Sequence, residues 1–146
     1  MTKILPMTEA HREAVLSMMR FFYASPAVAT NGSEEIFQAD IDACVGSSPY
    51  AEGFVFETDG NLSGYAMLAK SFSTEYGMPC IWIEDIYLEP EYRNQGIGSQ
   101  FFDYLEKQFP CHLFRLEVEE ENAPAVHTYR KNGFTEMPYI EMKRGR

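Results

Sequence analysis

The feature that most constrains this chain is an apolar segment that runs into a glycine-containing turn and then into a segment with helical periodicity, over residues 81–108. The apolar run before the turn, residues 81–88, predicts a buried strand. Ile97, Phe101, Leu105 and Phe109 then recur every four residues, which predicts a helix with one apolar stripe. The first N–H groups of a helix have no partner inside it, and the helix dipole favours negative charge there. The turn therefore predicts an anion site of the kind that holds phosphate.

The turn reads Arg93-Asn94-Gln95-Gly96-Ile97-Gly98. Gly96 and Gly98 carry no Cβ, so a ligand can approach the backbone closely. Arg93 adds a planar cation that suits phosphate oxygens. A glycine turn alone is a weak signal, and the strand before it and the helix after it strengthen the prediction.

Length and charge restrict the class of protein. The 146 residues predict a single domain over residues 1–146, with a core large enough to fold without staples. Twelve basic and 22 acidic side chains give a net charge of −10, which disfavours a nucleic-acid partner. An acidic surface is compatible with a small cationic substrate, although it can equally serve solubility alone.

The cysteines and the apolar runs indicate the compartment. Cys44, Cys80 and Cys111 are far apart and form no CxxC or Cys/His cluster, so we expect reduced thiols and no metal site. No stretch reaches the roughly 20 apolar residues that cross a bilayer, and the start of the chain shows no cleavage signature. We therefore expect a cytoplasmic protein with no membrane partner.

The rest of the chain alternates between strand and helix patterns. An apolar helix face recurs over residues 9–24, and Ser33 caps a second helix that ends at Gly46. The acidic residues of that second helix, Asp40 among them, are expected on the face opposite its apolar stripe, as solvated surface or as an entrance for a cation. The remaining expected elements are a first strand at 3–6, a hairpin of strands 53–58 and 62–72 around Asp59-Gly60, strands at 81–88 and 113–119, a short helix at 123–131 capped by Asn122, and a last strand at 134–142.

Two residues are candidates for acid–base chemistry. Strict alternation along residues 81–88 sends Glu84 to one face with Trp82, and Asp85 to the other face with Ile83. Glu84 in a mostly apolar strand is either a functional acid or base or a structural carboxylate. The Tyr129 phenol, with a reference pKa near 10, can donate a proton at neutral pH, or can simply be a packed aromatic ring.

These residues together resemble a known family. The turn 93–98 is similar to the R/Q-x-x-G-x-G/A signature of the GNAT superfamily of acetyl-CoA-dependent N-acyltransferases, and the strand with Glu84, then Asn122, then the segment 129–134 follow the family's order and spacing. The resemblance covers roughly residues 1–142 and is sharp from about 80 to 134. Within the superfamily, the segment 82–88 with residues 92–93 and 96–99 is most similar to the diamine branch, which includes spermidine/spermine and thialysine acetyltransferases.

The resemblance implies an α/β (α+β) fold with a mixed central sheet of about six to seven strands and about four flanking helices. Parallel strands around residues 81–88 and 113–119 would splay apart. It also implies transfer of an acetyl group from acetyl-CoA, without a metal, to a primary amine of a small molecule, a polyamine or an amino-acid-like amine. The amine would attack directly in a ternary complex. A protein, peptide or antibiotic amine remains open, as does a non-catalytic CoA-binding regulatory protein. Relatives of this kind are commonly homodimers.

The resemblance also implies roles for particular residues. Glu84 would take a proton from the amine, directly or through a water, and Tyr129 would protonate the leaving thiolate. Family members often have glycine where this chain has Asn94, but only a backbone amide is needed there. The donor would be bound by Ile86, Tyr87, Leu88, Arg93, Asn94, Gln95, Gly96, Ile97, Gly98, Ser99, Asn122, Ala125 and Tyr129.

The acceptor side is less determined. Glu84 and, on the next strand, Arg115 and Glu117 are the candidate substrate contacts. Arg115 suits a polyamine poorly, because both are cations, and would instead suit the carboxylate of an amino-acid-like acceptor.

Overall fold

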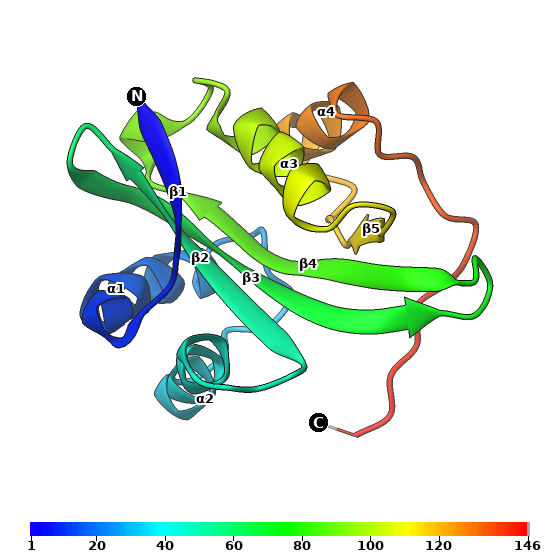
Figure 1. The fold of residues 1–146 in the computed structure, drawn as a ribbon, viewed down its shortest axis with the longest axis horizontal. Helices are drawn as coiled ribbons and strands as arrows, with labels where there is room; N and C mark the ends of the chain where they lie inside the picture. Colours follow the sequence, from blue (N-terminus) through cyan, green and yellow to red (C-terminus); the bar gives the residue numbers. More distant parts are fainter. Residues whose placement is uncertain (146) are drawn as a thin grey trace.

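The computed structural model describes residues 1–145, and within them one five-stranded sheet is flanked by four α-helices (Figure 1). This is an α+β arrangement, with two short 3₁₀ turns at Glu9–His11 and Pro90–Tyr92. The strands are β1 (Thr2–Pro6), β2 (Ala51–Thr58), β3 (Asn61–Ser73), β4 (Met78–Leu88) and β5 (Leu113–Leu116). The helices are α1 (Arg12–Tyr23), α2 (Glu34–Val45), α3 (Ile97–Gln108) and α4 (Ala123–Lys131).

The strands lie in sequence order across the sheet, from β1 to β5. Neighbours from β1 to β4 are antiparallel, and β5 runs parallel to β4 because the chain crosses over through α3. Asp59 and Gly60 both have positive φ, 51° and 86°, as a two-residue hairpin turn with the right twist requires. The predicted hairpin and the predicted parallel crossover are therefore confirmed.

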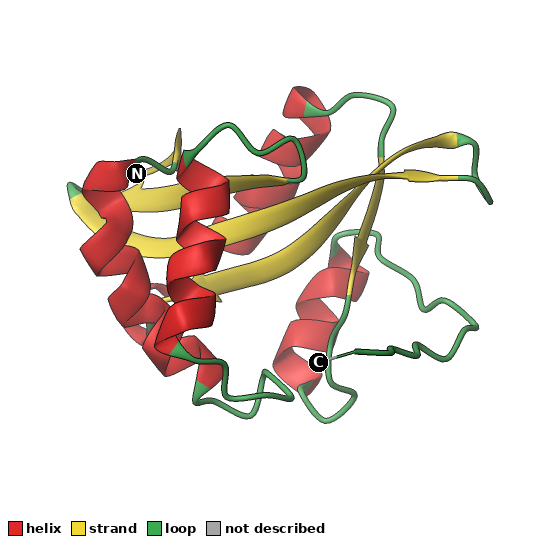
Figure 2. Ribbon diagram, turned by 90° about the horizontal axis from the view of Figure 1, so that it is seen from below, coloured by secondary structure: helices red, strands yellow, loops and turns green. Residues whose placement is uncertain are grey.

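Helices cover both faces of the sheet (Figures 1 and 2). The pair α1 and α2 packs on one face, in a cluster that includes Val15, Met19 and Ile41 with Tyr65 from the sheet. The helix α3 packs on the opposite face, where Phe101 and other residues join the inward side chains of β2 to β4. The helix boundaries follow the predicted caps, since the Ser33 hydroxyl accepts a hydrogen bond from the N–H of Ile36 at the start of α2.

The strand β4 departs from the predicted alternation. Its register with β3 pairs Met67 with Asp85 and Leu68 with Ile83, so Glu84 is the extra residue of a β-bulge. As a result Ile83 packs in the α3 cluster, whereas Asp85 faces α1 through its tyrosine partners. The prediction that Ile83 and Asp85 share a face was wrong, because a bulge shifts the two-residue period by one.

The predicted last strand, residues 134–142, is also wrong, and the sheet has five strands within residues 1–145 instead of six to seven. After α4 the chain runs in an extended path past the end of the β3–β4 hairpin (Figure 1), where the Tyr139 hydroxyl donates to the Glu75 carboxylate at 2.6 Å. Alternating apolar residues predict a strand only if a ladder partner is present. Here β5 pairs over four residues, and Pro138 offers no N–H.

Candidate active site

The two parallel strands separate in the middle of the sheet. Pairing between β4 and β5 runs from Cys80 and Leu113 to Ile83 and Leu116, after which β4 continues to Leu88 while the other chain leaves the sheet. Among the described residues, the edge of β4 from Glu84 onward therefore has no ladder partner on the β5 side. Free backbone groups on a central strand require a partner, and an extended amide-containing ligand can provide one. The predicted splay is present, and Ile86, Tyr87 and Leu88 line it.

The glycine turn lies at the end of β4, where it opens α3. Gly96 is the residue before the helix and has a φ of 82°, which is a left-handed conformation that favours glycine. A Cβ placed on Gly96 or Gly98 would meet nothing within 4 Å, so the backbone there is open to a ligand. Asn94 also has positive φ, at 62°, and asparagine tolerates this conformation better than other side-chain-bearing residues. These features fit a pyrophosphate group.

Arg93 has a role in this turn beyond the predicted charge. Its Nε donates to the carbonyl of Leu88 at 2.9 Å, and its guanidinium lies 5.5 Å from the centroid of the Tyr87 ring. The side chain of Gln95 likewise donates to the carbonyl of Glu91 at 2.9 Å. Both side chains fasten the turn to the end of β4 and the 3₁₀ turn, so the predicted donor residues of the turn lie beside those at the end of β4.

Tyr129 of α4 lies beside α3. Its ring centroid is 6.0 Å from those of Phe102 and Phe134, and the residue is half-buried. Burial raises the pKa of the Tyr129 phenol, so the group stays protonated at neutral pH. Asn132 holds the two helices together, because its amide donates to the Ser99 hydroxyl at 3.0 Å and to the carbonyl of Thr128 at 2.8 Å. A phenol in this setting can serve as a proton donor.

The start of α4 is set by Asn122. Its side-chain oxygen accepts from the N–H of Ala125 at 3.4 Å, as expected for a helix cap. In the structure the amide therefore caps the helix, and both Asn122 and the half-buried Ala125 lie at the end of α4 that follows the splayed chain.

Glu84 projects from the bulge in β4 and is exposed, while its neighbour Asp85 is buried. Although the residue as a whole is exposed, partial burial of the carboxyl group raises the pKa of Glu84, and the charges of Asp85 and Glu141 raise it further. Asp85 accepts hydrogen bonds from the hydroxyls of Tyr23, at 2.9 Å, and Tyr65, at 2.8 Å. Burial raises the pKa of Asp85, and these two hydrogen bonds oppose the rise. The two tyrosines bind Asp85 and so hold the bulge against the α1 face, while the Glu84 side chain remains exposed.

Further carboxylates face this point from separate elements. Asp40 of α2 has its pKa raised to about 6 by burial and by the charges of Asp85 and Glu84, so it faces the sheet, contrary to the sequence expectation. Glu117, beyond β5, has its pKa raised to about 7 by a hydrogen bond with Glu141 of the C-terminal segment, then by burial. Sequence reasoning missed Tyr23, Tyr65 and Glu141; only the period of α2, with Asp40 three residues after Phe37, could have placed Asp40 toward the sheet.

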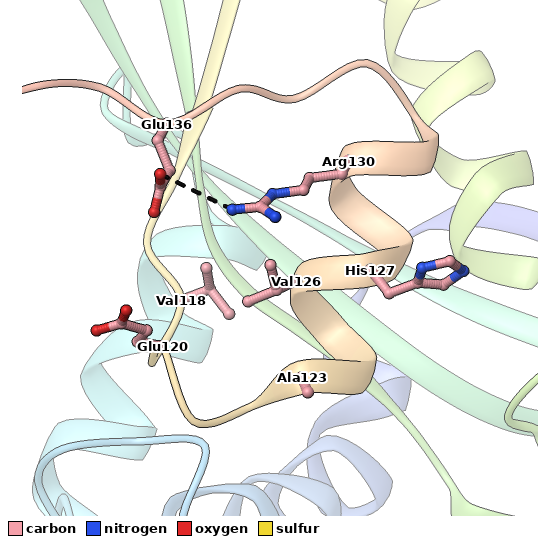
Figure 3. A pocket seen from close by; sticks show the side chains of 7 residues that line it. All are labelled: Val118, Glu120, Ala123, Val126, His127, Arg130 and Glu136. Carbon is pink, nitrogen blue, oxygen red and sulfur yellow. Dashed lines mark ion pairs between the residues drawn. The ribbon is translucent and has the colours of Figure 1, made fainter.

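One open pocket of about 540 Å³ lies on another side of α4 (Figure 3). It is bordered by the chain after β5, by α4 and by the chain after α4, where Arg130 pairs with Glu136 at 3.8 Å. Its lining includes neither Glu84, Tyr129 nor the glycine turn. We therefore place the candidate site at the splay of β4 and β5.

Elsewhere in the fold, no helix within residues 1–145 has the length and apolar character of a membrane span.

Comparisons with known proteins agree with this geometry. The profile of the Acetyltransferase (GNAT) family matches residues 16–134, and the chain therefore belongs to the GNAT family of acetyltransferases.

Particular relatives differ in what they acetylate. Streptothricin acetyltransferase from Streptomyces lavendulae is 38% identical over 80 residues, which cover 52% of this chain and 40% of that protein. Thialysine N-epsilon-acetyltransferase from Sus scrofa is 36% identical over 83 residues, with 55% and 48% covered. The thialysine enzyme from Mus musculus is 32% identical over 120 residues, with 75% and 68% covered. The chain thus spans about half the length of the first two of these relatives.

Solved structures share the fold at low sequence identity. A possible acetyltransferase from Clostridium difficile 630 superposes with a TM-score of 0.83 at 17% identity, over 99% of this chain and 97% of that one. An aminoglycoside N-acetyltransferase in complex with CoA superposes with a TM-score of 0.79 at 17% identity, over 100% and 95%. These likenesses confirm the predicted GNAT-like fold.

Proposed function

We propose that this chain transfers an acetyl group from acetyl-CoA to a primary amine of a small molecule, either a polyamine or an amino-acid-like amine. The observation that carries the proposal is the splay of β4 from β5 directly beside the open glycine turn. The splayed edge of β4 offers backbone groups to the amide-containing arm of acetyl-CoA, and the glycine turn offers N–H groups to its pyrophosphate. Membership of the acetyltransferase family supports the same donor.

In this proposal each residue acts on one part of the donor. The turn residues Asn94 to Ser99 hold the pyrophosphate through backbone N–H groups, with Arg93 anchoring the turn. The backbone N–H and C=O groups of Ile86, Tyr87 and Leu88 pair with the pantetheine arm. Asn122 and Ala125 border the other side of that arm. Acetyl-CoA supplies a thioester, whose acyl carbon is open to attack by an amine.

Glu84 and Tyr129 manage the two protons of the reaction. Glu84 accepts a proton from the ammonium, directly or through a water, because an alkylammonium with a pKa near 10 has no lone pair for attack. The C–N bond forms, the C–S bond breaks, and Tyr129 gives its proton to the departing thiolate. The second proton that the nitrogen loses on becoming an amide restores the Tyr129 phenol, and the proton on Glu84 passes to solvent. The raised pKa of Glu84 brings this base closer to neutral pH, and the raised pKa of Tyr129 keeps a proton on the phenol to donate, although it also makes the phenol a weaker acid.

Binding of the donor can be tested without knowing the acceptor. Acetyl-CoA at about 100 times its Kd should stabilise the fold by about 2.7 kcal/mol and raise Tm by roughly 5–10 °C. Dephospho-acetyl-CoA and free acetate serve as graded controls. An unchanged Tm at millimolar acetyl-CoA would remove the donor assignment.

The acceptor class can be tested by thiol release across a panel of amines. Similarity to the thialysine enzymes supports an amino-acid-like amine as the acceptor. Similarity to the streptothricin enzyme supports a second candidate, an antibiotic amine. The carboxylates Asp40, Glu84, Glu117 and Glu141 would suit either cation. A panel of lysine analogues, polyamines, streptothricin and lysine-containing peptides should show turnover in one of these groups. If acetyl-CoA binds and none of the panel is acetylated, a non-catalytic CoA-binding protein becomes the better description.

We also propose that the chain forms a homodimer through its C-terminal segment. Ile140 and Met142 are 89% and 92% exposed on an extended stretch that ends near the splay, and β5 forms one edge of the sheet. Exposed apolar side chains beside an open strand edge are typical of an interface. Sedimentation should give twice the monomer mass of 16.7 kDa, and Ile140→Glu should return the monomer.

A further inference from the structure

Arg115 is an exception among the charged residues near the splay. Its Nε is the one buried side-chain nitrogen or oxygen without a hydrogen-bond partner among residues 1–145. Its guanidinium also takes part in none of the ion pairs within that range. A buried guanidinium N–H without an acceptor is costly. This Nε is closed to solvent, so an incoming acceptor atom would be met by the terminal nitrogens of the same group.

The surroundings hold Arg115 in one orientation. Its guanidinium carbon lies 4.6 Å from the centroid of the Trp82 ring, the distance of a cation–π contact. The two residues pair across β4 and β5 on the second-last rung before the strands separate. Stacking covers one flat face of the guanidinium and leaves its in-plane N–H donors for a planar anion such as a carboxylate.

This pair lies on the acceptor side of the sheet. Ile81, Ile83 and Phe114 of the same strands belong to the α3 cluster, so alternation directs Trp82 and Arg115 to the opposite face. The C-terminal segment also passes this face, since Arg115 lies close enough to the Tyr139 phenol to lower its pKa, against the stronger opposite effect of Glu75. Arg115 and Trp82 therefore face away from α3.

We propose that Arg115, held on Trp82, binds a carboxylate of the acceptor, and that the substrate is therefore an amino acid whose reactive amine lies at the end of its side chain. This inference rests on the proposed acetyltransferase function. Glu84 lies two residues beyond Trp82, about 6–7 Å along the strand. An extended lysine spans a comparable distance, because six bonds of about 1.5 Å separate its carboxylate carbon from its side-chain nitrogen.

The charges on the two ends of such a substrate match the site. The ammonium end meets Glu84, Glu117 and Glu141, and the carboxylate end meets Arg115. A polyamine would place a second cation beside Arg115 and lose affinity for that reason. Arg115 acts here as a specificity-determining residue and takes no part in the bond changes.

The test compares substrates that differ only by one carboxylate. Lysine is compared with cadaverine, and 6-aminohexanoate with hexylamine, by thiol release with saturating acetyl-CoA. For the wild type, kcat/KM should be roughly 10- to 100-fold higher for the carboxylated member of each pair. Equal values, or a preference for cadaverine, would overturn the inference whether or not any variant folds.

Variants then assign the selectivity to Arg115. Arg115→Gln should lower kcat/KM by roughly 10- to 100-fold for the carboxylated members alone, chiefly through KM. Arg115→Lys, which keeps the charge and loses the planar fork, should be intermediate. Arg20→Gln is the matched control, because it removes the same charge from an exposed residue of α1, which pairs with Glu34 of α2. An equal loss for both members of a pair in Arg115→Gln would show a structural role and overturn the proposal.

The outcomes also separate this inference from the proposed function. If polyamines or peptides are acetylated and the carboxylated amines are not, the acetyltransferase function stands and the role of Arg115 falls. If no amine in any panel releases thiol, the acetyltransferase function itself fails and the inference fails with it.

Discussion

The proposed donor side and the proposed acceptor side of this molecule are built in different ways. The donor side is one continuous stretch, from the end of β4 through the turn to α3, and it offers mainly backbone groups. The acceptor side gathers side chains from α1, α2, β4, β5 and the C-terminal segment. A backbone-built site tolerates changes in side chains, whereas a site built from distant side chains changes its ligand with each substitution. Relatives acting on thialysine and on streptothricin are consistent with this division.

The largest expected effect is at Tyr129, the proposed donor of a proton to the leaving thiolate. Tyr129→Phe keeps the packing against Phe102 and Phe134 and removes the proton donor. We expect kcat to fall by about 10²- to 10⁴-fold with the Kd for acetyl-CoA unchanged. Steady-state kinetics and calorimetric titration check the two parts. Full turnover in this variant, where chemistry limits the rate, would remove the general-acid role.

Glu84 should show the next largest effect. Since burial and neighbouring charges raise its pKa, the acid limb of the kcat/KM profile should lie above pH 4.5 and rise as the carboxyl group loses its proton. Glu84→Gln should lower kcat/KM by about 10²-fold near neutral pH and flatten that limb.

The matched control for Glu84 is Glu91→Gln, a neutralised carboxylate on the 3₁₀ turn before the donor site. It should keep the wild-type profile. An unchanged profile in Glu84→Gln would move the base to a chain of waters.

A pair of glycines tests the backbone character of the donor side. Gly96 and Gly60 have similar φ, 82° and 86°, and a Cβ on either meets nothing within 4 Å. Replacement by alanine should therefore cost each about 1–2 kcal/mol of folding free energy, measured by denaturant unfolding. Gly96→Ala alone should also weaken acetyl-CoA binding by roughly 10-fold, because its backbone lies in the proposed pyrophosphate site. Equal Kd values for the two variants would contradict that placement.

The smallest effect concerns charge on the acceptor side. Glu117, with its pKa raised to about 7, is mostly neutral at pH 6 and mostly charged at pH 8, so attraction for a cationic amine grows with pH. KM for the acceptor should fall a few-fold over that range, as expected for a partly exposed ion pair. Glu117→Gln should reduce the fall, while Glu121→Gln, an exposed neighbour before α4, should follow the wild type. A KM independent of pH in the wild type would exclude this contribution.

Much of the fold followed from local patterns. Helices α1 to α4, the Asp59-Gly60 hairpin and the crossover from β4 to β5 lie close to their predicted positions, because periodicity, caps and turn residues act over a few neighbours. The two errors in the sheet share one cause. The bulge at Glu84 and the missing strand at residues 134–142 depend on what the neighbouring strand offers, which a single segment does not encode.

The opening stretch marks the boundary between these two kinds of information. Local sequence was enough to identify an anion-binding turn between a strand and a helix, because glycine geometry and the helix N-terminus act within ten residues. Only the tertiary structure brought Tyr23, Tyr65 and Asp85 together, turned Asp40 toward the sheet and stacked Arg115 on Trp82. Those contacts join residues up to 62 positions apart, and the folding of the whole sheet decides which of them meet.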